Sequence, residues 1–389
     1  MTAPLRVLSI ATLFPDAARP NFGLFVERSL RALADQPGIE LTVAAPVGLP
    51  PWPLSLHTRY KPLRALPRLE SWNGLTVHRP RFALIPRFGA RFNPAAVARA
   101  VLPIARAVQP DVIDAQFFYP DGPAAMRVAE ALGVPFSAKA RGADISHFGH
   151  DPATRPQLLA AAEAAAGMLA VSDAMRRDMA AIGIDAGKVR VHYTGIDGDR
   201  FHPDDRAAAR ATFAMGDAPA ILTVGALIPR KGQELVIAAL PALPGVHYWL
   251  AGAGAKEAAY RALAARLGVA DRVHLLGPVA NADLPQLYRA ADVVVMPSKS
   301  EGLANAWVEA LACGTPIVIS DAGGAAELVT SPVAGRIVPR DPEAIAQAVQ
   351  QILAAPPASV DVAASLGGRF DWDRNGRELA DHLRGSMGR

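Results

Sequence analysis

The segment from Val293 to Ile319 constrains the fold of this sequence more than any other stretch. It begins with a continuous apolar run, Val293 to Met296, of the kind that forms a parallel strand covered on both faces. A polar loop and a helical stretch follow, and Gly314 and Pro316 are suited to end that helix before a second apolar run starts at Ile317. A strand, a helix and a strand in this order predict one βαβ unit of a parallel sheet, and hence an α/β protein.

Two glutamates in this segment, Glu301 and Glu309, are eight positions apart. If both lay on one helix, they would share one face at about 12 Å from each other. That separation is larger than the ~5–9.5 Å between the two carboxylates of a glycosidase. It suits one long ligand held at two points, with an anion between them at the helix N-terminus, where Gly302 lets the backbone approach closely. A sugar joined through a diphosphate to a ribonucleoside has this order of hydroxyls, anion and hydroxyls.

The complete string from Ser300 to Val318, SEGLANAWVEALACGTPIV, resembles the Glu-x7-Glu signature of retaining GT-B glycosyltransferases of family 4, the glycosyl transferases group 1. Two glutamates that merely face solvent would be the simpler interpretation, but they would not require the rest of the string. In that family the first glutamate meets the donor sugar and the second meets the nucleotide ribose, which implies these roles for Glu301 and Glu309. The resemblance also implies donor contacts at Gly302, Leu303, Ala304 and Asn305.

The resemblance extends over most of the 389 residues and is strongest from about Lys188 to Pro339. It implies two Rossmann-like, doubly wound domains that face a cleft, and two domains are also what the length favours. The stretch YTGIDGDRFHP resembles the family's passage into the second domain, and the tail RFDWDRNGRELADHLRG resembles its final helix. We therefore expect an acceptor domain in residues 1–195, a nucleotide-sugar donor domain in residues 196–370, and a helix in residues 371–389 that crosses back to the first domain.

A second group of candidate residues follows a predicted strand, Ala220 to Val224. Arg230 and Lys231 come between that strand and a helix, so two cations and the free amides of a helix start would form an anion site. Two solvated cations are the alternative interpretation. The family usually has a basic residue where this chain has Ala226, so Arg230 would have to supply that charge. Similar transferases hold the nucleotide base against the backbone at the position of Val279.

In the first domain the candidate residues are Gly23 and Arg141. No G-x-G-x-x-G follows the first predicted strand, Leu5 to Thr12, which argues against an NAD-binding fold there. The resemblance implies that the turn at Gly23 faces the interdomain cleft near donor phosphate and acceptor; an ordinary strand-to-helix turn is the alternative. Arg141 stands where the family often has the histidine of His-Gly-x-Asp, and it could bind sugar or phosphate as a fixed cation. We expect Asp144 to fix this turn.

The net charge of the chain is +4 at pH 7, and basic residues are concentrated between Arg59 and Arg99, where Glu70 is the only acid. Aromatic residues are interleaved with them. A solvated loop surface explains this segment without a partner, whereas a surface for an anionic membrane or a lipid-linked pyrophosphate would use both the charge and the aromatics. No nucleic-acid-binding motif accompanies the charge. The basic residues are Arg59, Lys61, Arg64, Arg68, Arg79, Arg81, Arg87, Arg91 and Arg99.

Several sequence features indicate where the protein is located and whether it binds a metal or cofactor. No apolar run approaches the ~18 residues of a membrane-spanning helix, the N-terminus lacks the parts of a signal peptide, and the single Cys313 excludes an internal disulfide. We therefore expect a cytoplasmic protein, with peripheral contact to the inner face of the membrane through residues 59–99 as an option. Asp-x-Asp occurs at Asp197 and Asp371, but neither follows a strand directly, and no zinc-spaced cluster is present. We expect no metal, and no cofactor apart from the nucleotide sugar as substrate.

The residues and the resemblance together predict a retaining, metal-independent transferase. It would move a hexose from a UDP- or GDP-sugar to a hydroxyl of a glycan or lipid-linked acceptor, in surface polysaccharide or glycolipid assembly. Lys231, Arg230 and helix amides would stabilise the leaving diphosphate, and Glu301 would orient the sugar. A nucleotide-sugar 2-epimerase, which uses the same cleft without an acceptor, and a non-catalytic nucleotide-sugar-binding protein are the alternatives.

Overall fold

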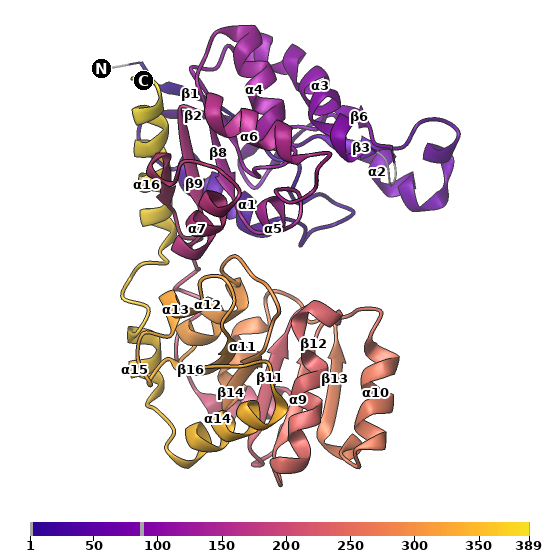
Figure 1. Ribbon diagram of the computed structural model, residues 1–389, viewed down its shortest axis with the longest axis vertical. Helices are drawn as coiled ribbons and strands as arrows, with labels where there is room; N and C mark the ends of the chain where they lie inside the picture. Colours follow the sequence, from indigo (N-terminus) through magenta and orange to yellow (C-terminus); the bar gives the residue numbers. More distant parts are fainter. Residues whose placement is uncertain (1–2, 86–88, 389) are drawn as a thin grey trace. The chain divides into compact units, whose positions relative to one another are not determined.

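The computed structural model describes residues 3–85 and 89–388, and the chain divides into two compact units (Figure 1). The first unit comprises Met1–Gly195 and Trp372–Arg389, and the second comprises Ile196–Asp371. Each is a Rossmann-like α/β unit built around a largely parallel sheet, which is the fold class that the sequence predicts. Arg87, one of the residues of the predicted basic segment, lies outside the described residues.

The sheet of the first unit has the strand order β10-β9-β8-β7-β1-β2-β5-β4 in the described residues, and β4 with β5 is its antiparallel pair. The central strands β1 and β7 are buried apart from Arg6, as expected of parallel strands covered on both faces. The strands are β1 (Leu5–Ile10), β2 (Ile39–Ala44), β4 (Leu69–Trp72), β5 (Leu75–His78), β7 (Val112–Ala115), β8 (Phe136–Ala140), β9 (Gly167–Ala170) and β10 (Val189–Val191). A separate parallel pair consists of β3 (Val47–Leu49) and β6 (Arg81–Ala83).

Helices connect these strands and cover the sheet (Figure 1). They are α1 (Leu24–Ala34), α2 (Lys61–Ala65), α3 (Asn93–Val108), α4 (Asp121–Leu132), α5 (Ala143–Ser146), α6 (Arg155–Ala164), α7 (Asp173–Ala181) and α16 (Trp372–Ser386). The last of them comes from the C-terminal end of the chain and packs against α1. Its Leu379 and Leu383 are fully buried, and the Ser29 hydroxyl of α1 donates to Asn375 Oδ1 at 2.9 Å. The C-terminal helix is therefore part of the core of the first unit.

A buried lysine connects β8 to this C-terminal helix. Lys139 is 1% exposed, and its Nζ lies 2.7 Å from Nδ1 of His192. His192 Nε2 in turn donates to the Asn375 carbonyl oxygen at 2.9 Å, so Nδ1 is the acceptor for Lys139. Burial lowers the pKa of Lys139 well below its ordinary value, and burial together with Lys139 does the same to the pKa of His192. Both shifts favour the neutral forms of the two side chains.

We expect Lys139→Met to change how stability depends on pH. In the unfolded chain Lys139 stays protonated up to about pH 10.4, whereas burial in the fold lowers its pKa and favours the neutral form. Folding of the wild type therefore releases a proton between the two pKa values, so its stability rises with pH by up to about 1.4 kcal/mol per unit. The variant lacks this gain. Urea unfolding of both proteins at pH 7, 8 and 9, above the range in which His192 titrates, measures the difference; a difference independent of pH would show that Lys139 is charged in the fold.

The sheet of the second unit is entirely parallel in the described residues, with the order β13-β12-β11-β14-β15-β16. Its strands are β11 (Ala220–Val224), β12 (His247–Ala251), β13 (Val273–Gly277), β14 (Val293–Met296), β15 (Ile317–Ser320) and β16 (Gly335–Val338). Its helices are α8 (Arg206–Thr212), α9 (Gln233–Ala239), α10 (Glu257–Arg266), α11 (Leu284–Ala290), α12 (Asn305–Ala312), α13 (Ala325–Leu328), α14 (Pro342–Ala354) and α15 (Ser359–Ala364). The βαβ unit predicted around residues 293–319 is β14, α12 and β15.

One premise about this unit is wrong. The predicted separation of Glu301 and Glu309 assumes that both lie on one helix, but α12 begins at Asn305 and Glu301 lies in the loop before it. Ala304 precedes the first helical residue with an extended backbone (ψ 122°), which stops the helix from extending further towards the N-terminus. Glu301 is therefore oriented by a loop and Glu309 by a helix.

Among the described residues, no helix has both the length and the apolar character that crossing a membrane requires.

Candidate active site

The carboxyl edge of the second sheet contains a topological switch point between β11 and β14. The chain passes from β11 to β12 on one side, and the strands that come later, β14 to β16, are added on the other side. In open α/β sheets the loops that leave the strands diverge at such a point and form a crevice for ligands. The loop after β11, residues 225–232, is called the cation loop here, and the loop after β14, residues 297–304, the glutamate loop. Arg230 and Lys231 lie in the cation loop, and Glu301 lies in the glutamate loop.

Three predicted residues meet where the two loops come together. Lys231 Nζ lies 2.6 Å from Glu301 Oε1, and Arg230 Nη1 lies 3.2 Å from the same oxygen. Arg230 also donates to the Ser300 carbonyl oxygen. The side chains of Lys231 and Glu301 are 13% and 10% exposed, whereas that of Arg230 is 43% exposed. Two cations share one carboxylate, so this cluster carries a net charge of about +1 and favours an anion.

Backbone contacts hold the two loops against each other. The Lys299 amide donates to the Arg230 carbonyl oxygen at 2.7 Å, which fixes the turn that carries both cations. On the other side, the Gly324 amide donates to the Gly302 carbonyl oxygen at 2.8 Å. Gly323 has a φ of +53°, and a Cβ there would collide with the carbonyl oxygens of Glu301 and Gly302. The loop between β15 and α13 therefore packs against the backbone of the glutamate loop and holds it in place.

Glu309 projects from α12 and is held by a buried tyrosine. The hydroxyl of Tyr288, on α11, donates to Glu309 Oε2 at 2.8 Å. Tyr288 is fully buried, and burial together with the neighbouring carboxylate raises the pKa of its phenol well above the ordinary value. The phenol therefore remains a proton donor at any physiological pH and holds Glu309 through Oε2.

The other residues predicted in this unit lie along the same edge. Leu303 and Ala304 belong to the glutamate loop, and Asn305 is the first residue of α12. Val279 is half-buried after β13, on the far side of β12 from the cation loop. Residues at the carboxyl ends of β15 and β16 and in the loops after β14, β15 and β16 line a neighbouring pocket of about 340 Å³, among them Ser298, Lys299, Ser320 and Asp321.

The remaining two predicted residues belong to the first unit. Gly23 precedes α1 with a φ of 72°, and a Cβ there would lie 2.6 Å from the Leu13 carbonyl oxygen, so no other residue fits. Arg141 follows β8, and its Nε donates to the Gln116 carbonyl oxygen at 2.6 Å. Among the described residues, its buried Nη1 has no hydrogen-bond partner. Burial lowers the Arg141 pKa to about 10, a change that Asp114 and other acids partly offset, so the side chain stays charged at neutral pH.

Asp144 fixes the turn that carries Arg141. Its carboxylate accepts the amide of Gly142 at 2.7 Å, the amide of Phe118 at 3.0 Å, and the amide of Arg141 itself. Three backbone donors on one buried carboxylate are a strong constraint on the local backbone. Asp144 therefore positions the turn, and its oxygens are occupied by the protein.

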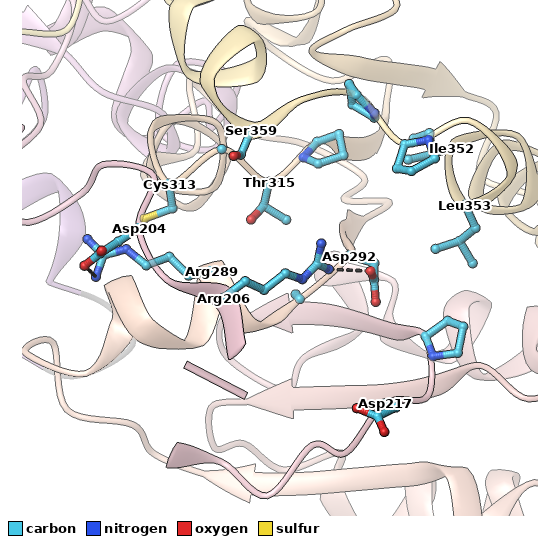
Figure 2. A pocket seen from close by; sticks show the side chains of 16 residues that line it. Asp204, Arg206, Asp217, Arg289, Asp292, Cys313, Thr315, Ile352, Leu353 and Ser359 are labelled. Atoms are coloured by element: carbon cyan, nitrogen blue, oxygen red, sulfur yellow. Dashed lines mark hydrogen bonds and ion pairs between the residues drawn. The ribbon is translucent and has the colours of Figure 1, made fainter. Parts of the chain in front are cut away.

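A second pocket, of about 280 Å³, opens at the opposite, amino edge of the second sheet (Figure 2). Asp292, just before β14, accepts the Ala220 amide at 2.7 Å and Arg210 Nη2 at 2.6 Å, and it also pairs with Arg206. Arg289 donates to two backbone carbonyls and is 7% exposed. These charges tie strand ends together, and the pocket contains none of the predicted site residues.

Two protein-family models match the chain over most of its length. The model described as "Glycosyltransferase Family 4" matches residues 24–200, and the model described as "Glycosyl transferases group 1" matches residues 205–365. The chain belongs to the group 1 glycosyltransferases. The match to the group 1 model thus lies within the unit that holds the cation and glutamate loops.

Curated relatives of this group 1 chain agree with the assignment. A D-inositol 3-phosphate glycosyltransferase of Mycolicibacterium gilvum is 36% identical over 218 residues, which cover 51% of this chain and 48% of that protein. A GDP-mannose-dependent alpha-(1-6)-phosphatidylinositol monomannoside mannosyltransferase of Mycobacterium tuberculosis is 34% identical over 209 residues, or 49% of this chain and 54% of that protein. The chain spans about half the length of the curated relatives it matches.

Solved structures of other proteins show the GT-B fold of this group 1 chain. Sucrose-phosphate synthase from Thermosynechococcus elongatus superposes with a TM-score of 0.80 at 21% identity, over 99% of both chains. HepE from Anabaena, in complex with UDP, superposes with a TM-score of 0.77 at 22% identity, over 98% of this chain and 99% of that one. At this level of identity the likeness concerns the fold.

The sequence analysis did not identify the residues that position Glu301 and Glu309. Tyr288 lies in a helix whose pattern is that of an ordinary buried face, so nothing in the sequence marks it as a partner of Glu309. Gly323 belongs to a Gly-Gly turn, but its role as a support for Glu301 depends on a contact between loops. Both roles require knowing which segments lie side by side.

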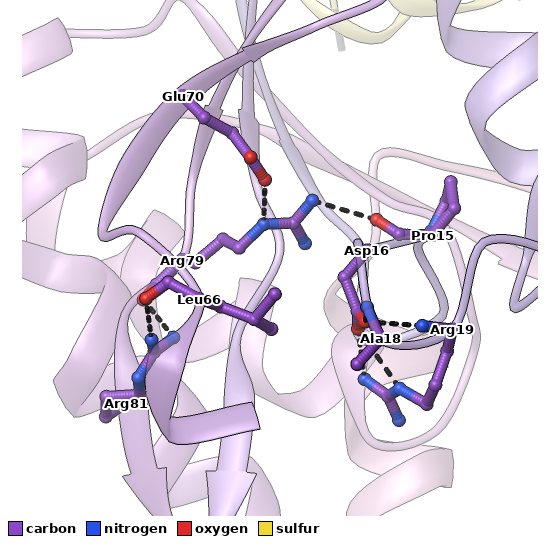
Figure 3. A network of polar contacts seen from close by, with 8 residues as sticks. All are labelled: Pro15, Asp16, Ala18, Arg19, Leu66, Glu70, Arg79 and Arg81. Atoms are coloured by element: carbon purple, nitrogen blue, oxygen red, sulfur yellow. Dashed lines mark hydrogen bonds and ion pairs between the residues drawn. The ribbon is translucent and has the colours of Figure 1, made fainter. Parts of the chain in front are cut away.

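Two members of the predicted basic segment are not part of a basic surface (Figure 3). Arg79 is 1% exposed; it pairs with Glu70 and donates to the Pro15 carbonyl oxygen at 2.8 Å. Arg81 donates to the Leu66 carbonyl oxygen at 2.5 Å and to that of Arg79 at 3.0 Å. Arg79 follows β5 and is buried, and Arg81, on β6, is half-buried with its guanidinium bound to backbone carbonyls. A surface formed by all the basic residues from Arg59 to Arg99 is therefore wrong at these two positions.

Proposed function

We propose that this chain transfers a hexose from a nucleotide-diphosphate sugar to a hydroxyl of a glycan or lipid-linked acceptor, with retention of anomeric configuration and without a metal ion. The observation that carries the proposal is the meeting of Lys231, Arg230 and Glu301 at the switch point of the second unit. Cations and a carboxylate placed together there are suited to a ligand that has both a diphosphate and sugar hydroxyls.

The cation loop would stabilise the charge that develops on the leaving diphosphate. In the structure Glu301 Oε1 pairs with both cations and fixes their positions. Arg230 is exposed enough to turn towards an incoming anion. Groups that are already in place need little reorganisation when negative charge accumulates, which is why fixed cations lower such barriers. Arg230 supplies the charge for which the family uses the position of Ala226.

The two glutamates would bind the two ends of the donor. Glu301, released in part from the cations by the diphosphate, would accept hydrogen bonds from the transferred sugar. Glu309 would accept those of the ribose, and Tyr288 would keep its carboxylate in position. Between them, the backbone of Gly302 to Asn305 would lie against the donor, with Val279 near the base.

In the first unit, we propose that Arg141 binds a sugar or phosphate oxygen and that the turn at Gly23 lies near the donor phosphate and the acceptor. Arg141 is a charged side chain with an unpartnered buried N–H, and an unsatisfied donor of this kind is costly unless a ligand completes it. This supports a role in binding an oxygen of a sugar or phosphate.

Relatives support a nucleotide-sugar donor. The name of the mycobacterial mannosyltransferase includes GDP-mannose, and the HepE structure contains UDP. The names of the two curated relatives include D-inositol 3-phosphate and phosphatidylinositol monomannoside. We propose a UDP- or GDP-sugar as donor here, and assembly of a polysaccharide or glycolipid at the cytoplasmic face of the membrane as the setting.

The proposal is tested by incubating the protein with UDP- and GDP-hexoses, first alone and then with glycan and lipid-linked acceptors. Acceptor-dependent release of the nucleoside diphosphate, with an α-linked product from an α-linked donor, is the expected result. An epimer formed from the donor alone would identify a 2-epimerase instead. Tight donor binding with neither transfer nor hydrolysis would identify a binding protein.

We expect turnover to be unaffected by EDTA. Lys231 and Arg230 would do what a divalent ion does in metal-dependent transferases, namely neutralise the leaving diphosphate. Across the described residues there is no group of three or more His, Cys, Asp or Glu side chains that could hold a metal. Initial rates before and after EDTA treatment and desalting, followed by addition of Mg²⁺ or Mn²⁺, measure this. A loss of rate with EDTA that either ion restores would contradict the mechanism.

A further inference from the structure

A cluster of exposed apolar side chains lies in residues 50–68 of the first unit, here called the tip segment. Trp52 is 79% exposed, Leu54 61% and Leu56 58%, so three large apolar side chains within five residues face solvent. Figure 1 shows that the segment around α2 projects from the edge of this unit. Single exposed apolar residues are normal on protein surfaces, whereas a contiguous group on a projecting segment marks an interaction site.

The tip segment has a defined structure that presents these side chains. It consists of two 3₁₀ turns, Leu54–Leu56 and Thr58–Tyr60, followed by α2. Arg64, on α2, donates from Nη1 to the Ser55 carbonyl oxygen at 2.7 Å and so ties the first turn to the helix. The apolar side chains are therefore held outwards by local hydrogen bonds that do not use them.

The charge that surrounds these apolar side chains is positive. Glu70 is the only acid between Leu41 and Pro110, and its carboxylate is taken up by the buried Arg79 at the base of the segment (Figure 3). In contrast, Lys61 and Arg68 are exposed, as is Arg59, whose guanidinium lies 4.5 Å from the centre of the Tyr60 ring. An acidic partner can therefore approach the tip without meeting a negative side chain of the segment itself.

We propose that the tip segment docks on an anionic lipid bilayer. Trp52, Leu54 and Leu56 enter the interface between headgroups and acyl chains, and the exposed cations bind lipid phosphates. An apolar tip bordered only by cations matches a surface that has hydrocarbon beneath a layer of negative charge. The lipid-binding surface of the tip segment differs from the basic surface considered for residues 59–99. Its apolar side chains precede Arg59, and it does not include Arg79 and Arg81. It does not depend on the identity of the donor or acceptor.

Vesicle sedimentation tests the proposal with the full-length chain. We expect binding to vesicles of phosphatidylglycerol and phosphatidylcholine, much weaker binding to phosphatidylcholine alone, and a decrease with salt. The triple variant Trp52→Ser, Leu54→Ser, Leu56→Ser and the double variant Lys61→Glu, Arg68→Glu should each weaken binding about tenfold or more. Val360→Ser and Arg266→Glu are the matched controls, because they change an apolar and a cationic side chain that are exposed on the second unit.

Tryptophan fluorescence locates the contact. Trp52 is 79% exposed, so its insertion should shift the emission to the blue and reduce quenching by iodide, and Trp52→Phe should remove most of this change. The proposal is overturned if anionic vesicles do not bind, or if the tip variants bind as well as the two controls. It is also overturned if the chain dimerises without lipid and the triple variant is monomeric, since the tip would then contact a second copy. The same variants should transfer the sugar to a water-soluble acceptor at an unchanged rate. This measurement distinguishes a failure of membrane docking from a failure of the proposed transferase activity.

Discussion

Lys231→Ala is expected to lower kcat on the order of 10²–10³-fold, with a smaller change in KM for the donor. Lys231 is the less exposed of the two cations and lies 2.6 Å from Glu301. Its charge matters most when the bond to the diphosphate breaks, and removal of one preorganised group that stabilises such charge typically has an effect of this size. Steady-state kinetics of product formation measure it. Lys188→Ala, which removes an exposed lysine of the first unit, should leave kcat unchanged.

A purely structural role for Lys231 makes a different prediction. If the lysine only neutralises Glu301, then Lys231→Ala leaves this carboxylate with the more exposed Arg230 as its remaining cation of the pair, and adding Glu301→Gln should restore both stability and activity. If both side chains act on the donor, the double variant stays as inactive as the worse single variant. Thermal denaturation of all three variants shows whether they fold. Recovery of turnover in the double variant would remove Lys231 and Glu301 from the catalytic mechanism.

Glu309→Gln is expected to weaken donor binding about 10–100-fold with little change in kcat. A hydrogen bond to a charged group contributes roughly 1.5–3 kcal/mol, and the proposed bond to the ribose is formed in the ground state and the transition state alike. The wild type should bind a nucleoside diphosphate more tightly than its 2′,3′-dideoxy analogue, and the variant should lose most of that preference. Calorimetric titration of both ligands measures it, with the exposed Glu343→Gln of α14 as control.

Tyr288→Phe should reproduce part of this effect because the hydroxyl only positions Glu309. The preference for the ribonucleotide should fall by less than in Glu309→Gln, and kcat should be unaffected. A variant that loses kcat and keeps the preference would contradict a positioning role. An unchanged preference in Glu309→Gln itself would show that the ribose binds elsewhere.

The parts of this fold that follow from local sequence were predictable. The apolar run of β14, the glycine at position 314 with a φ of 80° and the proline at 316 determine a strand, a helix end and a second strand within one short segment. The helix start was harder to place, because no side chain caps α12 and Ala304 gives no signal. The polar residues 298–302 predicted a loop that contains Glu301, but they could not fix the first helical residue at Asn305.

The contacts of the candidate site could be predicted only as far as the family pattern reaches. The pattern identified Lys231 and Glu301 separately, but their ion pair joins residues 70 positions apart and exists because β11 and β14 are neighbours in the sheet. Tyr288 and Gly323 act through similar contacts between segments. In the basic segment, the sequence could not distinguish the buried Arg79 from the exposed Lys61, since burial depends on whether loop carbonyls and Glu70 are within reach.

A crystal structure of the protein with a bound nucleotide sugar tests the central claim most directly. We predict that the diphosphate lies at the carboxyl edge of the second sheet, with Lys231 Nζ and backbone amides of residues 302–305 within hydrogen-bonding distance of its oxygens, and with the ribose at Glu309. A diphosphate bound at the amino edge beside Asp292, bound within the first unit alone, or held through a divalent ion would contradict this account.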